Sequence, residues 1–483
     1  MPRYPAPPVF RTPADFRAHL RGLGASFDLD DSILPAPSSP LAQPFKLRSG
    51  RTIGNRWCVL PMEGWDCLPN GAPGENTRRR WLRFATGGAK LLFGCEACAV
   101  MESGRSNTRQ MTITEETAPA LAALLADCRR AHAEKFGTAD DLLVGLQLTH
   151  SGRYSHPHDD AKLEPVTAYS NPLLDNKFGC SAANVVTDAE IPGIVAAFGR
   201  AAALAQKCGF DFVDVKCAHG YLAYEFLGAI ERPGPYGGSF ENRTRFFREC
   251  VAAVRAAAPG LEVATRFSLF DMIPFEKGPD GIGRPMSIPG VAGPGAYPYA
   301  FGGDGTGLAA DPELREPIAF LRLCRDLGIE LVCTTIASPY YAPHAQRPAY
   351  FPVSDGYLAP EDPMTGVDRQ IRAVAKAKAA MPEIACVSAG LTALQEYLPH
   401  VAQRLVREGL ADFAGYGRMV LSYPDLPSDS LRGIPLEKCK ICRTFGDCTT
   451  APRHGIVSGC YPLDPAYRTS PAAPLVRACK FKA

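Results

Sequence analysis

The 483-residue sequence contains no run of about 18 apolar residues and no strong imbalance of charge. A helix that crosses a bilayer needs such a run, so we expect no membrane-spanning segment. Lys and Arg number 52 against 50 Asp and Glu, which provides no long-range field to attract nucleic acid or an anionic membrane. The composition therefore argues against nucleic-acid and membrane partners.

The N-terminal segment also lacks the features of a secretory signal. Prolines interrupt residues 1–16, MPRYPAPPVFRTPADF, where a signal peptide requires an unbroken apolar core. We therefore expect a cytoplasmic protein in which most of the 17 cysteines are reduced and many are buried. Their odd number also argues against a complete disulfide framework.

Eight short apolar runs rich in β-forming residues recur along the chain. They are RWCVLPM at 56, AKLLFG at 89, LLVGLQLTH at 142, DFVDVKC at 211, LEVATRFS at 261, IELVCTTI at 329, EIACVSAG at 383 and ADFAGYG at 411. Segments of helical period lie between them, and Thr187 with Glu190 and Thr392 with Gln395 have the spacing of capping boxes. Eight alternating units predict an α/β fold, a (β/α)8 TIM barrel, although periodicity alone leaves a doubly wound sheet open.

The chain divides into three predicted parts. These are a proline-rich N-terminal extension over residues 1–44, the barrel over 45–430 and a cysteine-rich C-terminal extension over 431–483. Two connections inside the barrel, 150–186 and 271–310, are too long for simple βα loops. We expect both insertions to lie over the mouth of the barrel, where this fold builds its active sites.

Chemically active residues follow the predicted strands. The stretch DVKCAHGYLAYEF, residues 214–226, places Lys216, His219 and Tyr221 close together after the fourth run. AGL at 389–391 follows the seventh run, and GYGRM at 415–419 follows the eighth. Because glycine amides can approach an anion closely and arginine can neutralise it, these two segments predict a phosphate-bearing cofactor. A plain turn is the alternative for each glycine taken alone.

Two neighbouring motifs are more specific, AHGYLAYEFL at 218 and YGGSFENRTRF at 236. Further motifs occur in order along the chain: VLPMEGW at 59, GRSN at 104, LQLTHSGR at 146, TRFS at 265, SPYYAPHAQRPAYFP at 338 and GRMVLSYPDLP at 417. Together they resemble the old yellow enzyme (NADH:flavin oxidoreductase) family, FMN-dependent barrels that reduce activated alkenes. The resemblance implies a flavoprotein oxidoreductase that acts on a small molecule, with NAD(P)H as a candidate electron donor.

The resemblance also implies contacts to FMN. Pro61 and Met62 would form a wall beside the flavin ring. Gln147 would hydrogen-bond its pyrimidine edge, and Arg266 would face the N1 and C2 carbonyl region, where negative charge develops on reduction. The residues that would hold the phosphate end are Ala389, Gly390, Gly417 and Arg418.

Catalytic roles follow from the same resemblance. In the family, two side chains three residues apart hold the substrate carbonyl oxygen, so that flavin N5 delivers hydride to the β carbon of the alkene. Lys216 and His219 match these positions, and Tyr221 matches the tyrosine that gives a proton to the α carbon. His344, after the sixth strand, corresponds to a histidine that reaches the pocket in the 2,4-dienoyl-CoA reductase branch.

Two residues depart from the family pattern. Histidine is commoner than lysine at position 216, and Lys216 would favour a carboxylate or an anionic enolate, or would pair with Asp214 and leave the pocket. A small or hydroxyl residue commonly follows the Pro-Met pair, where this chain has Glu63. A carboxylate beside the flavin would oppose its reduction unless it is protonated or turned away.

The C-terminal segment contains Cys439, Cys442, Cys448 and Cys460 with the spacing C-x2-C-x5-C-x11-C. Four thiolates can bind a [4Fe-4S] cluster or tetrahedral zinc, and spacing alone does not choose between them. Relatives such as 2,4-dienoyl-CoA reductase carry a similar motif after the barrel, with a middle gap of x3, so the resemblance favours the iron-sulfur cluster. Its electrons would then come from a separate electron-donor protein.

A different class of function also fits the sequence. In this alternative, the chain is a non-redox ligand-binding barrel with a zinc-held interaction tail, and Lys216 and Glu63 reflect the loss of redox chemistry. The sequence leaves the identity of the alkene and the formation of a homo-oligomer open.

Overall fold

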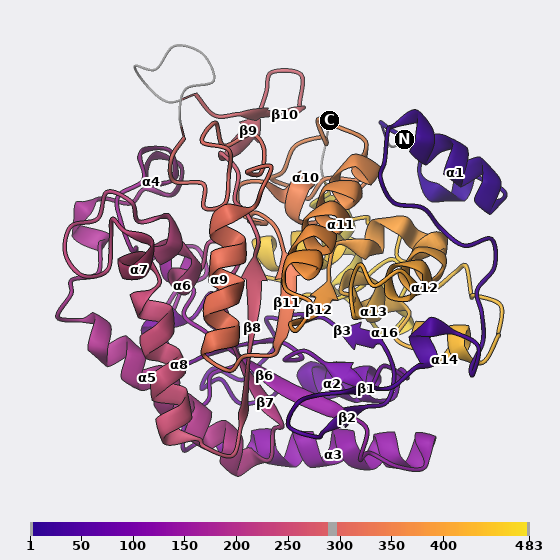
Figure 1. The fold of residues 1–483 in the computed structure, drawn as a ribbon, viewed down its shortest axis with the longest axis horizontal. Helices are drawn as coiled ribbons and strands as arrows, with labels where there is room; N and C mark the ends of the chain where they lie inside the picture. Colours follow the sequence, from indigo (N-terminus) through magenta and orange to yellow (C-terminus); the bar gives the residue numbers. More distant parts are fainter. Residues whose placement is uncertain (1–2, 288–296, 481–483) are drawn as a thin grey trace.

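The computed structural model describes residues 3–287 and 297–480 (Figure 1), and their strand pairings form a closed ring of parallel strands. Each strand pairs in parallel with two neighbours, and the pairings of β3 with β13 and of β4 with β6 close the ring. In ring order the strands are β3 (Trp57–Val59), β4 (Leu91–Leu92), β6 (Leu143–Thr149), β7 (Phe212–Val215), β8 (Glu262–Ser268), β11 (Leu331–Thr335), β12 (Ala385–Ser388) and β13 (Phe413–Tyr416). The predicted (β/α)8 TIM barrel is confirmed, and each predicted run contains one barrel strand.

The barrel strands are buried on both faces, which explains why they read as continuous apolar runs. One separate buried cluster fills the lumen and includes Cys58, Leu143 and Phe212. Their chain neighbours Val144 and Val213 belong to the larger core between strands and helices. The lumen is therefore a packed core, and a ligand site has to form at its carboxyl end.

Helices alternate with the strands and surround them, and α3 runs along the lower edge of Figure 1. The main helices are α2 (Glu75–Ala85), α3 (Ala118–Phe136), α5 (Ile191–Cys208), α8 (Arg245–Ala257), α9 (Arg315–Asp326), α11 (Pro363–Ala380), α12 (Leu398–Arg407) and α14 (Leu426–Leu431). The other helices are α1 (Pro13–Gly22), α4 (Pro172–Phe178), α6 (Leu222–Glu225), α7 (Phe240–Arg243), α10 (Pro343–Gln346), α13 (Arg418–Ser422), α15 (Asp447–Thr450), α16 (Pro465–Arg468) and α17 (Ala473–Ala478).

Both predicted capping boxes are wrong. The Thr187 backbone and hydroxyl donate to Glu190 at 2.7 Å, but α5 begins only after Glu190 and receives no side-chain cap. Thr392 lies inside the 3-10 helix η7 (Leu391–Tyr397), and α12 begins at Leu398. In each case a proline stands in the first turn of the α-helix, where its fixed φ and missing N–H are tolerated.

The two long connections follow the carboxyl ends of β6 and β8, at the mouth of the barrel. Residues 150–186 contain α4 and short 3-10 turns, whereas residues 271–310 contain an antiparallel hairpin of β9 (Phe275–Lys277) and β10 (Gly283–Pro285). The Phe275 amide donates to the Tyr341 carbonyl at 2.7 Å, which joins this hairpin to the loop after β11. Residues 288–296 of the second connection lie outside the described residues.

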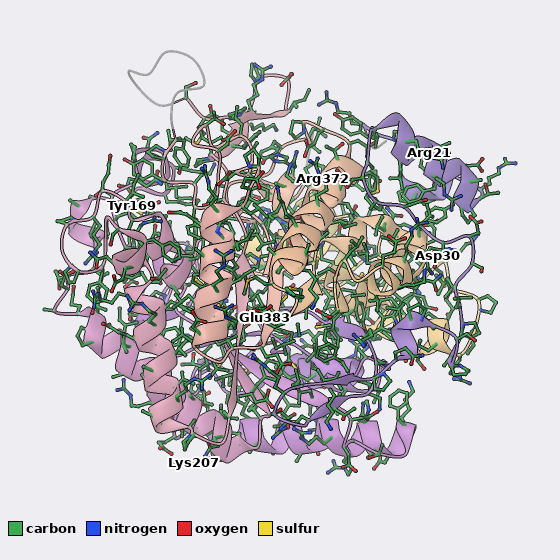
Figure 2. All side chains as sticks on the ribbon, in the orientation of Figure 1. Arg21, Asp30, Tyr169, Lys207, Arg372 and Glu383 are labelled. Carbon is green, nitrogen blue, oxygen red and sulfur yellow. The ribbon has the colours of Figure 1, made fainter. Side chains whose placement is uncertain are left out.

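The remaining short strands lie at the rim of the barrel. The hairpin of β1 (Phe45–Lys46) and β2 (Thr52–Ile53) places Leu47 and Ile53 in the lumen cluster, and β5 (Ala97–Ala99) pairs beside β6. Lys207 in α5 and Arg21 in α1 lie at opposite margins of the view in Figure 2. The division of the chain at residues 44 and 430 stays a prediction.

Two expectations from composition can be compared with the fold. No helix in the described part of the chain has the length and apolarity that a bilayer crossing requires. All 17 cysteines are free thiols, and most are buried. The absence of a disulfide framework agrees with the odd cysteine count.

Candidate active site

A buried carboxylate joins three adjacent barrel strands at the mouth. Asp214 in β7 accepts hydrogen bonds from Gln147 Nε2 in β6 at 2.5 Å and from the Arg266 backbone N in β8 at 2.6 Å. Burial raises the pKa of Asp214 to about 6, and both hydrogen bonds oppose that rise. Asp214 is thus occupied by Gln147 and by the Arg266 backbone, and among residues 3–287 and 297–480 the Lys216 ammonium contacts the Tyr221 ring and forms no ion pair with Asp214. The predicted alternative in which Lys216 leaves the pocket to pair with Asp214 is not the arrangement seen.

The Arg266 guanidinium is buried, with 6% of the residue exposed. Its Nε has no hydrogen-bond partner anywhere in the described chain. A buried donor without an acceptor is costly, and such positions require an explanation. An anionic or carbonyl edge of a bound ligand would supply the missing acceptor, and this fits the predicted flavin contact.

Lys216, His219 and Tyr221 follow β7 directly. The Lys216 ammonium lies 3.4 Å from the centroid of the Tyr221 ring, a cation–π contact. Burial lowers the pKa of Lys216 to about 7, and the negative charge of Glu63 opposes that shift. The lysine is therefore turned toward the predicted proton donor, inside the mouth of the barrel.

The backbone at His219 is held in the left-handed region, with φ of 67°. Such a conformation is unfavourable for a side chain other than glycine and persists only where the surroundings enforce it. The His219 amide donates to Ser268 Oγ at 3.1 Å, and Ser338 Oγ donates to the His219 carbonyl at 2.7 Å. The last residue of β8 and the loop after β11 thus hold this turn in place.

The imidazole of His219 contacts Gln346, a residue from the loop after β11. Gln346 Nε2 lies 3.0 Å from His219 Nε2, so the amide donates and the imidazole proton is on Nδ1. Burial lowers the pKa of His219 well below its usual value, with the charges of Arg266 and Lys216 acting in the same direction. The histidine is therefore neutral, and its Nδ1–H has no hydrogen-bond partner among the described residues.

Glu63 faces the same group. Its Oε1 accepts a hydrogen bond from Ser106 Oγ at 3.0 Å. Burial raises the pKa of Glu63 to about 7, while the charge of Lys216 opposes that rise. Near neutral pH the carboxyl group is therefore partly protonated, which weakens the expected conflict between Glu63 and a reduced flavin.

Two arginines share a cavity at the ends of β11 and β13. The cavity has about 460 Å³ of empty space, and its lining includes Arg347, Arg418 and Gly446. Burial lowers the pKa of Arg347 to about 9, with further lowering from the charges of Arg453 and Arg418. These arginines repel one another because they carry the same charge. An anion such as a phosphate group would relieve that repulsion and would itself be stabilised in the cavity.

The predicted glycine positions are closely packed. Gly390 has a φ of 79°, and a Cβ there would collide with the side-chain amide of Gln370. A Cβ on Gly417 would lie 3.3 Å from the Met62 sulfur, so the first and last barrel strands meet beside Met62. Gln370 Oε1 is buried and unpaired within the described residues, a second unmet polar atom near this end.

The other predicted residues are placed as follows. His344 Nδ1 is 2.8 Å from the Tyr357 hydroxyl, and both residues line the cavity of Arg347 and Arg418. His344 therefore belongs to that cavity, and its catalytic role stays a prediction. Pro61 is partly exposed, and Ala389 is buried in the lumen cluster.

The four C-terminal cysteines differ in burial. Cys439 is exposed, whereas Cys442 and Cys460 are buried. Burial raises the pKa of the Cys442 thiol to about 11, and the neighbouring Cys448 adds to the rise; Cys442 and Cys448 likewise raise the pKa of Cys460. Cys442, Cys448 and Cys460 thus influence one another electrostatically, but in the described chain they are not gathered within metal-ligand distance of one another. Metal binding by the four cysteines stays a prediction.

The C-terminal segment is fastened to the barrel at both sides of the mouth. Asp464 accepts hydrogen bonds from Arg79 at 2.9 and 2.8 Å and from Arg83 at 2.5 Å, both in α2. On the other side, Arg347 donates to Thr449 Oγ1 at 2.6 Å. The cysteine segment therefore lies against the arginine cavity.

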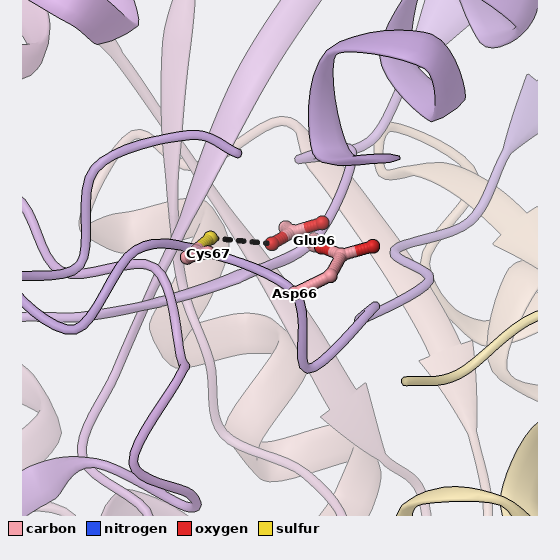
Figure 3. A group of neighbouring side chains, drawn as sticks. All are labelled: Asp66, Cys67 and Glu96. Carbon is pink, nitrogen blue, oxygen red and sulfur yellow. Dashed lines mark hydrogen bonds between the residues drawn. The ribbon is translucent and has the colours of Figure 1, made fainter. Parts of the chain in front are cut away.

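One compact group of potential metal ligands occurs in the described chain: Asp66, Cys67 and Glu96 (Figure 3). Arg80 lies between the two carboxylates, donating to Asp66 at 2.5 Å and also to Glu96. All four residues are buried. Because the one guanidinium already pairs with both carboxylates, the group is a buried ion-pair cluster.

Replacing Arg80 by Met is expected to destabilise the protein by about 3–5 kcal/mol, because two buried carboxylates lose their cation. Urea unfolding followed by circular dichroism measures the change. Arg78→Met is the matched control, since Arg78 lies in the same helix but its side chain is 49% exposed where it pairs with Asp127. We expect the control to cost less than about 1 kcal/mol. Equal losses would contradict the buried-pair argument.

Sequence reasoning missed Gln346, Arg347 and Gln370. Gln346 and Arg347 lie within the quoted segment at 338, but nothing in that segment indicates which side chains point inward. Gln370 lies in the middle of α11, where a polar residue is normally exposed. Its amide donates to the Ala345 carbonyl at 2.9 Å and so supports the same loop.

Comparisons with known proteins agree with this arrangement. Residues 40–282 match the model of the NADH:flavin oxidoreductase / NADH oxidase family. An NADPH dehydrogenase of Geobacillus sp. is 31% identical over 222 residues, covering 46% of this chain and 61% of the relative. A metal reductase of Desulforamulus reducens is 26% identical over 434 residues, covering 88% of this chain and 52% of the relative. The chain thus spans little more than half the length of these relatives.

Solved structures share the fold. A 2-naphthoyl-CoA reductase complex has a TM-score of 0.63 at 19% identity, and the match covers 89% of this chain and 57% of the reductase chain. The old yellow enzyme homologue from Zymomonas mobilis has a TM-score of 0.57 at 20% identity, and the match covers 82% of this chain and 94% of the homologue. The barrel with its long loops is therefore the architecture of these proteins as well.

Proposed function

The chain belongs to the NADH:flavin oxidoreductase / NADH oxidase family, and we propose that it is an FMN-dependent ene-reductase, which reduces an electron-poor C=C bond of a small molecule. The observation that carries the proposal is the grouping of Lys216, His219 and Tyr221 after β7, beside the buried and unsatisfied Arg266. NAD(P)H is the proposed electron donor.

The residues at the mouth fit FMN by their chemistry. Gln147 and the unpaired Nε of Arg266 would hold the ring, and Arg347 and Arg418 would hold the phosphate in their shared cavity. Pro61, Met62 and Gly390 would complete the cradle. When bound, FMN supplies the hydride, through its N5 atom.

The side chains after β7 have separate tasks in this proposal. Lys216 Nζ and the free Nδ1–H of His219 would donate hydrogen bonds to the substrate carbonyl oxygen, where negative charge develops. Tyr221 holds at its hydroxyl the proton that the α carbon receives. Burial raises the pKa of Tyr221 well above its usual value, so the phenol keeps its proton until a carbanion or enolate forms.

The cysteine segment adds a second part to the proposal. Cys439, Cys442, Cys448 and Cys460 would ligate a [4Fe-4S] cluster, with zinc as the alternative metal. A cluster there would accept electrons from a separate donor protein. The competing function is a ligand-binding barrel without flavin, whose C-terminal tail is held by zinc and mediates an interaction. That alternative requires only the four cysteine thiols.

Anaerobic purification tests both parts at once. We expect a flavin absorbance spectrum, release of FMN on denaturation, and iron with acid-labile sulfide. Protein that takes up no FMN during refolding or reconstitution would contradict the ene-reductase proposal. Zinc without iron would support the interaction tail and reject the cluster.

The charge of Lys216 should make the rate of alkene reduction depend on pH. Since burial lowers the pKa of Lys216 to about 7, the ammonium donor is present below that pH and is lost as the pH rises through it. With NADPH and 2-cyclohexen-1-one, kcat/KM should therefore fall above about pH 7. Lys216→Arg stays charged and should lack this fall, whereas Lys216→Met should be slow at every pH. An unchanged profile in Lys216→Arg would contradict the assignment.

A further inference from the structure

The proton donor Tyr221 touches a second phenol. Its hydroxyl lies 2.9 Å from the hydroxyl of Tyr340, which belongs to the loop after β11. Tyr221 is only 2% exposed, whereas Tyr340 keeps part of its surface accessible. The pair thus connects a buried hydroxyl with a position nearer to solvent.

The orientation of Tyr340 is fixed on two sides. Its ring stacks on Tyr154 with centroids 3.9 Å apart and an interplanar angle of 8°. Its amide donates to Ser338 Oγ at 3.3 Å, and the same hydroxyl donates to the His219 carbonyl. One serine therefore ties the Tyr340 loop to the turn that carries His219 and Tyr221.

The other groups around Tyr221 are engaged differently. The Lys216 ammonium lies over the face of the Tyr221 ring. Ser106 and the negative charge of Glu63 also act on the Tyr221 hydroxyl, but Ser106 Oγ donates its hydrogen to Glu63. Within the described residues, Tyr340 is therefore the phenol whose hydroxyl is hydrogen-bonded to the hydroxyl of Tyr221.

We propose that Tyr340 returns a proton to Tyr221 after each turnover, as a relay between the buried phenol and solvent. The inference rests on the proposed function, in which Tyr221 has given its proton to the α carbon. The O–H bond of Tyr340 then breaks while the O–H bond of Tyr221 forms, and water at the accessible side of Tyr340 replaces the proton. No oxidation state changes in this exchange.

The relay separates the first turnover from later ones. In Tyr340→Phe, Tyr221 still carries a proton, so a single turnover of dithionite-reduced enzyme with 2-cyclohexen-1-one should keep its rate. Steady-state turnover with NADPH should fall by about 10²-fold, with an initial burst, because reprotonation becomes slow. Imidazole buffer should partly restore the steady-state rate of the variant and leave the wild type unchanged.

Tyr350→Phe is the matched control, since Tyr350 lies on the same loop and its buried hydroxyl has no partner in the described chain. Equal losses in the first and later turnovers of Tyr340→Phe would indicate a merely structural role and overturn the relay. An unchanged steady-state rate would overturn it as well.

A measurement without turnover distinguishes the relay from the ene-reductase proposal. In protein with ¹³C-labelled tyrosine rings, Tyr340→Phe should shift the Tyr221 resonance, and Tyr350→Phe should not. A Tyr221 resonance that does not shift would show that the two hydroxyls are not in contact. The relay would then be excluded, whichever substrate the enzyme reduces. A wild-type protein that binds FMN but reduces no alkene would instead reject the proposed function.

Discussion

Replacing Tyr221 by Phe is expected to slow alkene reduction by about 10²- to 10⁴-fold, the usual contribution of a positioned general acid. Reduction of bound flavin by NADPH should stay nearly intact, because the phenol hydroxyl has no part in that half-reaction. The ring itself remains, so its contact with Lys216 is kept.

Stopped-flow spectroscopy measures the two half-reactions separately through the flavin absorbance. Tyr224→Phe is the control: Tyr224 is buried three positions further along, and its hydroxyl has no partner in the described residues. We expect the control to keep both rates. A similar loss of both half-reactions in Tyr221→Phe would rule out the proton-donor role.

Replacing Arg266 by Met is expected to slow flavin reduction by about 10²- to 10³-fold, as the removal of a preorganised charged donor does at other sites. The guanidinium lies buried and retains an unpaired Nε, so its charge is weakly screened and directed at whatever occupies the mouth. Without it, negative charge on a reduced ring would be less stable.

The reduction potential of bound flavin gives a second readout for this change. It should become more negative in Arg266→Met and stay constant in Arg255→Met, where the replaced arginine is exposed on α8. An unaltered potential together with an unaltered rate would show that Arg266 does not face the flavin.

Much of the fold is readable in the sequence because the barrel strands are buried on both sides. A strand such as β6 contains seven buried residues in succession, and no surface periodicity obscures it. Helix boundaries were less accessible, since the proline at the start of α5 and of α12 determined where each α-helix begins. The spacing of Thr with Glu or Gln therefore did not predict the helix start, because the proline is the stronger constraint.

The site was readable only where it is local in sequence. Lys216, His219 and Tyr221 lie on one turn, and their order carries the family resemblance. Tyr340 and Gln346 approach the same turn from about 120 residues away, with separations of 119 and 127 positions for their two hydrogen bonds. These two contacts form only when the barrel closes. No pattern along the chain indicates that Tyr340 and Gln346 will reach this turn.

The fastening of the C-terminal segment has a consequence for how the protein unfolds. Asp464, whose side chain is fully buried, grips two arginines of α2 across about 385 positions of sequence. We expect a tail held in this way to have no independent melting step, because detaching it breaks the hydrogen bonds of Asp464 to two arginines of the barrel. Tail and barrel should therefore denature in a single cooperative transition, and proteases should find no early cut between them.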